Sequence, residues 1–256
     1  MKTPLIIGHR GASAVAPENT MAAFREAIAA GCDGIEFDVR LTRDGVPVII
    51  HDSTLRRTAG LAARVADLTW AELEQVDVGS WFARPRNLPP TAFANETVPS
   101  LEQLLTLFQS NDLLVVLEMK CESPSEYLPL AEACCRLINE HSLKERVIVE
   151  CFHLAALTIV KDIDPEIKTA ALFEPSLTNP SVLSDQRLLD KANAVGASVL
   201  ALHRRIARQS LVEKAKLAGL QVAVWTVDDP SWLLRARSVG IDALITNDPA
   251  AMLAHR

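Results

Sequence analysis

The chain has 256 residues, a mass of 27.9 kDa and a net charge of −6, with 49% hydrophobic and 23% charged residues. This composition is typical of a globular protein with a sizeable core, and it excludes disorder as the main state. The acidic balance and the low aromatic content of 5% argue against a nucleic-acid partner, which would need a basic face. No apolar run approaches the ~20 residues of a membrane span. We therefore expect a small-molecule ligand and no stable membrane insertion.

The first residues and the cysteines indicate the compartment. The chain passes from Met1 through a short apolar run to His9, and this run is too short for the core of a signal peptide. The cysteines number five and show no C-x-x-C spacing, which disfavours both a disulfide framework and a zinc cage. We expect reduced thiols and a cytoplasmic location.

Eight apolar, β-rich runs alternate with helical patterns along the chain. The expected strands cover residues 5–9, 34–40, 113–119, 147–152, 168–173, 198–203, 221–227 and 243–246. In the second half each unit begins with a glycine at a helix end, as at Gly196, Gly219 and Gly240, followed by a loop and an apolar run. Eight strand–helix units in about 250 residues predict an α/β fold, the TIM (β/α)8 barrel. A doubly wound open sheet is the alternative.

One connection is longer than the others. After a short extended run at 46–50, residues 52–99 are rich in polar residues, proline and aromatics. Within and after this segment, Thr69–Glu72 and Ser100–Gln103 have the pattern of capping boxes that open helices. We interpret the segment as an insertion over the C-terminal mouth of the barrel, so that residues 1–256 form a single domain.

Charged residues occur at the ends of the second and third long strands. Glu36 and Asp38 are two residues apart, so both point to one face of their strand, and Glu118 and Lys120 repeat this spacing. Because the apolar face of a barrel strand meets the helices, these side chains are expected on the inner side, unless the strand edge is simply solvated. Three carboxylates together favour Mg²⁺ or Ca²⁺ over zinc, and Arg10 and Lys120 add the positive charge that a phosphate group requires.

Two histidines lie at the same predicted mouth. His9 ends the first strand, and His51 ends the short extended run. A single histidine at a strand end is more often structural, but two beside carboxylates are interpreted as an acid/base pair, because imidazole titrates near neutrality.

The chain resembles the glycerophosphodiester phosphodiesterases, in the bacterial cytoplasmic form. The motifs that carry this resemblance, in order, are His9-Arg10-Gly11, Pro17-Glu18-Asn19-Thr20, Glu36-x-Asp38, His51-Asp52, Glu118-x-Lys120, Val224-Trp225-Thr226-Val227, Gly240-Ile241-Asp242 and Thr246-Asn247-Asp248-Pro249. Each motif alone is weak, whereas the ordered set spans the chain and is specific.

The resemblance implies metal-dependent hydrolysis of glycerophosphodiesters to sn-glycerol 3-phosphate and an alcohol, within glycerol and lipid metabolism. The cation would be Mg²⁺ or Ca²⁺, with Mn²⁺ as an alternative. By position, the resemblance implies catalysis by His9 and His51, cation binding by Glu36, Asp38 and Glu118, and substrate binding by Arg10, Lys120 and Trp225.

The chain departs from the family pattern on the fourth long strand. It has Cys151-Phe152 where relatives commonly have Ser-Phe, and Glu150 precedes this pair. We expect Glu150 to form an outward salt bridge, and the alternative is that it adds a carboxylate to the site. One alternative function is a lysophospholipase D-like or other phosphodiesterase on the same barrel. In a lysophospholipase D, Trp81, Phe82 and Phe93 would contact the acyl chain of the substrate. The other alternative is a non-catalytic binding barrel.

Overall fold

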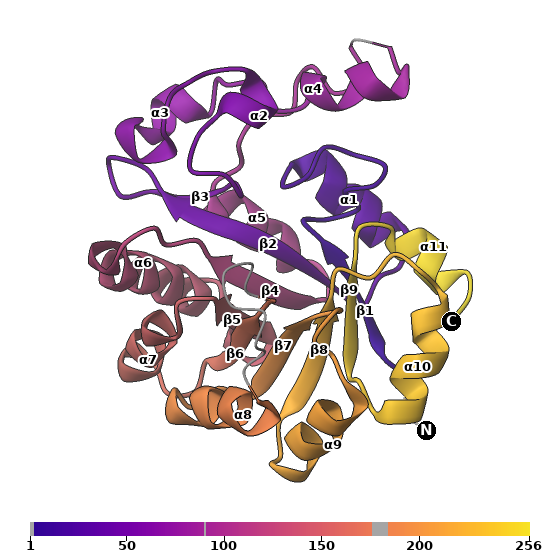
Figure 1. Ribbon diagram of the computed structural model, residues 1–256. Helices are drawn as coiled ribbons and strands as arrows, with labels where there is room; N and C mark the ends of the chain where they lie inside the picture. Colours follow the sequence, from indigo (N-terminus) through magenta and orange to yellow (C-terminus); the bar gives the residue numbers. More distant parts are fainter. Residues whose placement is uncertain (1–2, 90, 176–183) are drawn as a thin grey trace.

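Eight parallel strands close into a barrel in the computed structural model, which describes residues 3–89, 91–175 and 184–256. β1 pairs with both β2 and β9, which closes the ring (Figure 1). Around the barrel the strands are β1 (Leu5–His9), β2 (Gly34–Leu41), β4 (Leu114–Met119), β5 (Val147–Cys151), β6 (Lys168–Phe173), β7 (Val199–His203), β8 (Gln221–Trp225) and β9 (Ala243–Thr246). The TIM barrel and its eight predicted strands are confirmed.

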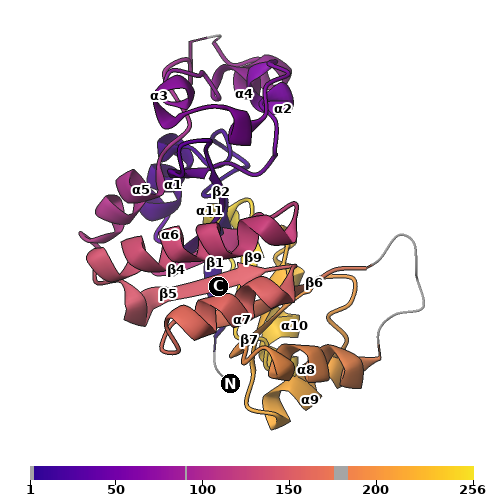
Figure 2. The same ribbon diagram turned by 90° about the vertical axis from the view of Figure 1, so that its left-hand side faces the viewer.

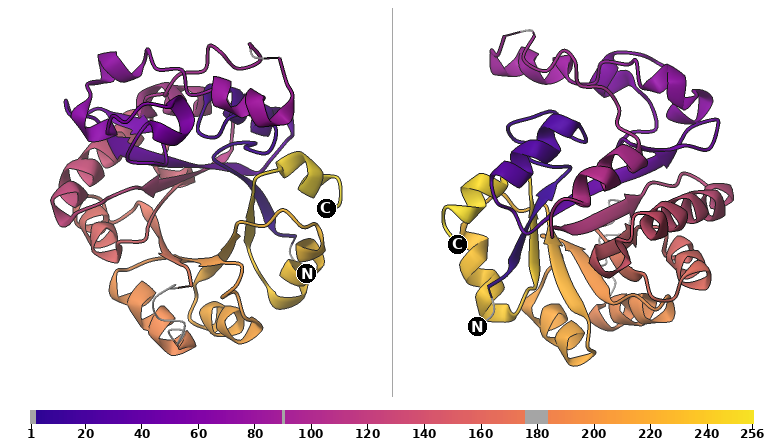
Figure 3. Two further views of the ribbon diagram at one scale, coloured as in Figure 1. Left: turned by 45° about the horizontal axis from the view of Figure 1, so that its top comes forward. Right: turned by 180° about the vertical axis from the view of Figure 1, so that it is seen from behind.

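The larger helices cover the outside of the barrel, as the two views of Figure 3 show. They are α1 (Met21–Ala29), α5 (Leu101–Phe108), α6 (Tyr127–Glu140), α7 (Leu154–Ile163), α8 (Asp185–Ala194), α9 (Gln209–Leu217), α10 (Ser231–Val239) and α11 (Pro249–Leu253). Short 3-10 turns, η3 (Pro124–Glu126) and η4 (Lys144–Arg146), precede α6 and β5. No helix in the described part of the chain is long and apolar enough to cross a membrane.

The side chains of β2 alternate between the apolar core outside the barrel and the inner face of the barrel. Phe37 is buried on the outer face, where its ring lies 6.1 Å from that of Phe24 and 6.2 Å from that of Phe108. The inner face of the barrel instead carries Glu36 and Asp38 at this level, and a smaller cluster of mostly aliphatic side chains fills the interior, with Ala in several places. The prediction that the apolar face meets the helices is therefore correct for this strand.

Helix starts follow the chemistry of their capping residues. Both predicted capping boxes are present, at Thr69 before α3 (Trp70–Leu73) and at Ser100 before α5. Asp248 caps α11, with its side chain accepting from the Ala251 amide. Pro230 is the N-cap of α10, and the side chain of Asp229 accepts from the Ser231 amide at 2.9 Å.

The insertion projects from one end of the barrel beside α1 and α5 (Figure 2). It follows β3 (Pro47–Ile49), which pairs antiparallel with β2, and its elements are α2 (Arg56–Ala59), η1 (Val65–Asp67), α3, α4 (Ser80–Ala83) and η2 (Arg84–Arg86). A small apolar cluster that includes Leu55, Leu73 and Val78 fills it. Phe82 is buried between Trp81 and Phe93, with edge-to-face ring contacts at 5.9 and 5.5 Å.

Gly34 sets the spacing between β2 and β4. A Cβ atom there would lie 2.6 Å from the Leu114 carbonyl oxygen of β4, so Gly34→Ala must separate two paired strands. We expect this variant to lose about 3 kcal/mol of unfolding free energy, as for an overpacked core.

Gly219→Ala is the matched control, because nothing lies within 4 Å of its Cβ position and only its φ of +79° opposes a side chain. We expect a loss of about 1 kcal/mol there. Urea unfolding measures both values, and equal losses would show that strand spacing at Gly34 is not the constraint.

Candidate active site

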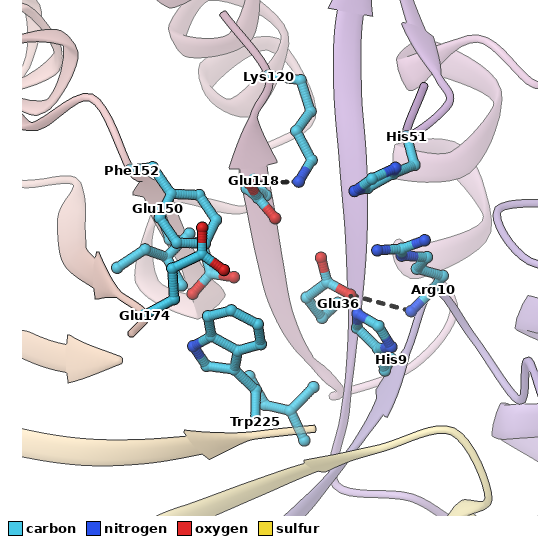
Figure 4. Close-up of a pocket in the computed structure, with 12 residues that line it drawn as sticks. His9, Arg10, Glu36, His51, Glu118, Lys120, Glu150, Phe152, Glu174 and Trp225 are labelled. Atoms are coloured by element: carbon cyan, nitrogen blue, oxygen red, sulfur yellow. Dashed lines mark hydrogen bonds and ion pairs between the residues drawn. The ribbon is translucent and has the colours of Figure 1, made fainter. Parts of the chain in front are cut away.

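A cavity of about 350 Å³ opens at the carboxyl ends of the barrel strands (Figure 4). Of the predicted site residues, those that line it are His9, Arg10, Glu36, His51, Glu118, Lys120 and Trp225. Its lining also contains residues to which the sequence analysis assigned no role in the site, namely Glu150, Phe152, Leu172, Glu174 and Ile245. Asp38 is fully buried and contacts the two cationic side chains of the lining.

The side chain of Asp38, on the inner face of β2, contacts three partners. One carboxylate oxygen accepts from Asn19 Nδ2 at 2.7 Å and lies 3.1 Å from Arg10 Nε, and the other lies 3.1 Å from Lys120 Nζ. Burial raises the pKa of this carboxyl, but the charges of Arg10 and Lys120 outweigh burial and hold the pKa well below its usual value. Asp38 is therefore ionised, and it fixes the positions of both cations.

Lys120 lies between two carboxylates. Its Nζ is 2.5 Å from Glu118 Oε1 and 3.1 Å from Asp38 Oδ1, and Figure 4 shows the ammonium group directed from β4 toward the cavity. Burial opposes the charge of Lys120, but these carboxylates raise its pKa above the ordinary value. The predicted i, i+2 arrangement thus places the charged groups of β2 and β4 side by side.

Glu36, Glu118 and Glu150 form a compact acidic cluster. They can bring one carboxylate oxygen each within 4.8 Å of the others. Burial raises the pKa of all three, and repulsion from neighbouring carboxylates raises it further. The pKa of Glu118 reaches about 7. Like charges this close are costly unless a proton or a cation neutralises them.

The inward position of Glu150 corrects our expectation of an outward salt bridge. Glu150 is 3% exposed, and β5 pairs with β4 so that Glu150 lies beside Glu118. Both side chains therefore point into the barrel. The alternation of β5 carried this signal, because Val147, Val149 and Cys151 are buried on the outer side while Glu150 lines the cavity.

The donor set fits a hard divalent cation. Among the buried carboxylate oxygens, Glu36 Oε1 has no hydrogen-bond partner in the described part of the chain. Asp38 Oδ1 and Glu118 Oε1 share one positive charge, the Lys120 ammonium group, at 3.1 and 2.5 Å. Oxygen ligands with uncompensated charge suit Mg²⁺, Mn²⁺ or Ca²⁺, and Glu150 offers a further carboxylate beside them.

The ring of His9 is oriented by Asn247, which follows β9. Its Nδ1 lies 2.7 Å from Asn247 Oδ1, while Asn247 Nδ2 donates to Asp228 at 2.8 Å. Because the amide nitrogen is engaged by Asp228, Asn247 presents an acceptor, and His9 carries its proton on Nδ1. Burial and the charge of Arg10 lower the pKa of His9 to about 4. Its Nε2 therefore holds a free lone pair, 3.9 Å from Glu36.

His51 is oriented by its neighbour in the chain. Its Nδ1 lies 2.7 Å from Asp52 Oδ1, and Figure 4 shows the ring directed toward the cavity opposite Lys120. Burial lowers the pKa of His51, and the charges of Arg10 and Lys120 lower it as well. The two histidines thus face one cavity as neutral imidazoles, each with its Nδ1 held by an oxygen acceptor.

An aromatic wall faces the charged groups. Phe152 and Trp225 meet edge to face at 5.6 Å, and Glu174 lies beside them in Figure 4. His203, the last residue of β7, packs against Trp225 with ring centres 5.1 Å apart. No described residue of 52–99 is among those that line the cavity.

The chain matches a known protein family. Residues 9–251 match the model of the glycerophosphoryl diester phosphodiesterase family. A glycerophosphodiester phosphodiesterase of Caldanaerobacter subterraneus is 35% identical, and the match covers 99% of this chain and 97% of that protein.

Solved structures give the same result. A phosphodiesterase of Oleispira antarctica, solved with its product sn-glycerol 3-phosphate, has a TM-score of 0.85 and 27% identity, covering 99% of this chain and 96% of that one. A glycerophosphodiester phosphodiesterase of Agrobacterium tumefaciens has a TM-score of 0.77 and 26% identity, covering 98% and 99%. The chain belongs to the glycerophosphoryl diester phosphodiesterase family, and it is a hydrolase of that family.

Proposed function

We propose that this protein hydrolyses glycerophosphodiesters to sn-glycerol 3-phosphate and an alcohol, with a divalent cation and the pair His9 and His51. One observation carries the proposal: a single cavity is lined by three buried glutamates, two cationic side chains and two neutral imidazoles. The relative solved with sn-glycerol 3-phosphate supports the identity of the product.

The cation would be held by Glu36, Asp38 and Glu118, with Glu150 as a nearby fourth carboxylate. When bound, it supplies charge neutralisation for the phosphoryl oxygens. Arg10 and Lys120 would bind the same phosphate group, because their cationic groups lie at the rim of the acidic cluster.

The histidines would move the protons. An oxygen of water, or the 2-hydroxyl of the glycerol, forms a bond to phosphorus while one imidazole accepts its proton. The bond between phosphorus and the alcohol oxygen breaks, and the other imidazole donates a proton to that oxygen. Its protonated form is favoured by the negative charge of the bound phosphate group. Attack by the 2-hydroxyl would give a cyclic phosphate that water then opens.

Substrate contacts beyond the phosphate would come from the aromatic wall. Trp225 lines the cavity opposite Arg10 and Lys120, a position suited to the carbon side of the glycerol. A substrate with an acyl chain is less well supported, since Trp81, Phe82 and Phe93 pack on one another inside the insertion. A reducing compartment such as the cytoplasm is supported by five buried cysteines, all of them free.

Removal of the cation should abolish turnover. Without it, the buried carboxylates repel each other and the phosphate charge is under-compensated. We expect activity on glycerophosphocholine to disappear after exhaustive chelation and to return with Mg²⁺, Ca²⁺ or Mn²⁺. Glu36→Gln should weaken cation binding, measured by calorimetry, while circular dichroism shows an intact fold. Full turnover by a preparation shown to be metal-free would contradict the proposal.

Stability of the metal-free protein should fall as the pH rises through the titration of Glu118. A carboxyl whose pKa is raised from 4.5 to about 7 stabilises the fold below pH 4.5 and loses that contribution as the pH passes 7. The shift corresponds to about 3 kcal/mol. Glu118→Gln mimics the protonated form, so we expect it to unfold at a higher temperature than the wild type at pH 8 and not at pH 5.

The exposed Glu140 on α6 gives the matched control Glu140→Gln, which should behave alike at both pH values. Adding the divalent cation should stabilise the wild type at pH 8 and much less at pH 5, because the cation competes with protons. An unchanged pH dependence in Glu118→Gln would show that this carboxyl is not strained by its neighbours.

The two histidines should respond differently to the leaving group. An alkoxide needs a proton from a general acid, which contributes about 10²–10⁴-fold, whereas nitrophenolate does not. One variant, His9→Ala or His51→Ala, should recover most of its relative kcat/KM on a nitrophenyl diester, while the other stays impaired. Equal losses by both variants on both substrates would contradict the division into acid and base.

A further inference from the structure

Arg57, on helix α2 of the insertion, has its guanidinium group engaged on three nitrogens. Nε donates to Asp52 Oδ2 at 2.7 Å, while Nη1 and Nη2 each donate to an oxygen of Glu18 at 2.8 Å. The indole ring of Trp81 flanks the group, 5.6 Å from Cζ. This planar fork of bonds is a geometry that arginine provides and lysine does not.

The two carboxylates that Arg57 holds each reach a different part of the site. Asp52 Oδ1 lies 2.7 Å from His51 Nδ1, and Glu18 Oε1 accepts from Arg10 Nη1 at 2.8 Å. The guanidinium group of Arg57 is therefore linked to His51 through the carboxylate of Asp52 and to Arg10 through the carboxylate of Glu18. Figure 4 shows these last two side chains entering the cavity from the same side.

The contacts of Asp52 also determine whether its side chain is charged. Burial disfavours the charge of Asp52, but the hydrogen bond from Arg57 and the contact with His51 lower its pKa to about 2. Asp52 is therefore an ionised acceptor that keeps the proton of His51 on Nδ1 and leaves Nε2 free for the reaction.

We propose that Arg57 is a positioning residue of the reaction, which fixes His51 through Asp52 and Arg10 through Glu18. This inference rests on the proposed roles of His51 and Arg10. Because no described residue of the insertion lines the cavity, the contribution of the insertion would be to hold this guanidinium group in place. Exposed ion pairs add little stability, and the Arg57 side chain is 40% exposed, so the effect should appear in the rate more than in unfolding.

Arg57→Ala and Arg56→Ala make a matched pair, because Arg56 is the exposed neighbour on the same short helix. We expect kcat/KM on glycerophosphocholine to fall roughly 10- to 100-fold in Arg57→Ala, the range typical of residues that orient site groups. Arg56→Ala should stay within about twofold of the wild type. Thermal unfolding of both variants controls for loss of fold.

Two further measurements separate positioning from a general structural role. Millimolar guanidinium chloride should restore much of the lost kcat/KM of Arg57→Ala, relative to equal sodium chloride, and should not restore His51→Ala. Combining Asp52→Asn with Arg57→Ala should cost less than the product of the two single losses, because both act through His51. Multiplicative losses together with no guanidinium rescue would overturn the inference.

The outcomes also separate this inference from the proposed function. If His51→Ala retains full kcat/KM, the assigned role of His51 is wrong, and the inference that depends on it is overturned as well. If His51→Ala is inactive while Arg57→Ala equals Arg56→Ala, the proposed function stands and only the positioning role of Arg57 is overturned.

Discussion

The burial of like charges at the carboxyl ends of β2, β4 and β5 is the constraint on which the site depends. Four carboxylates, from Glu36, Asp38, Glu118 and Glu150, are each at most 7% exposed. Arg10 and Lys120 supply two positive charges within ion-pair distance of this group, which leaves it electronegative. A protein interior tolerates such an excess only with bound protons or a further cation. The raised pKa of Glu118 and the affinity proposed for a divalent cation are two consequences of this imbalance.

The barrel can bury these charges because its apolar core outside the strands is separate from its interior. Most of the apolar core lies between the strands and the outer helices, where Phe37 packs between Phe24 and Phe108. The interior cluster is smaller and consists mainly of short aliphatic side chains. Because β-strands alternate, a residue such as Glu36 can carry charge inward while both of its neighbours contribute to the outer core. Stability and chemistry therefore use different faces of the same strand.

Features set by local sequence were the ones that could be predicted. Strand alternation placed Glu36 and Glu118 correctly, and the capping boxes at Thr69 and Ser100 follow from bonds within one turn of chain. The inward position of Glu150 was not the preferred expectation, although the alternation of β5 indicated its face.

Individual side-chain contacts between loops far apart in the chain were beyond the sequence alone. Asn247 reaches His9 across 238 positions, and Arg57 reaches Glu18 across 39. Neither spacing has a periodic signature, since such pairs depend on how the loops of separate strands meet at the mouth. The course of the insertion has the same origin. Its polar and aromatic composition indicated an excursion, but its packing beside α1 and α5 is a property of the folded chain.

The site is divided between the two halves of the barrel. β1, β2, β4 and the turn after β3 provide the cationic groups, the histidines and most of the buried carboxylates. β5 adds Glu150, and β5, β6 and β8 lead into Phe152, Glu174 and Trp225. The first half is tied together by ion pairs that run from Lys120 through Asp38 to Arg10, so changing one member affects the others. The wall opposite is joined by ring packing, and it meets the ion-pair chain where Lys120 Nζ lies 5.7 Å from the centre of the Phe152 ring. A change at Phe152 would therefore also alter the surroundings of Lys120, whereas we expect a change at Trp225 to leave these ion pairs in place.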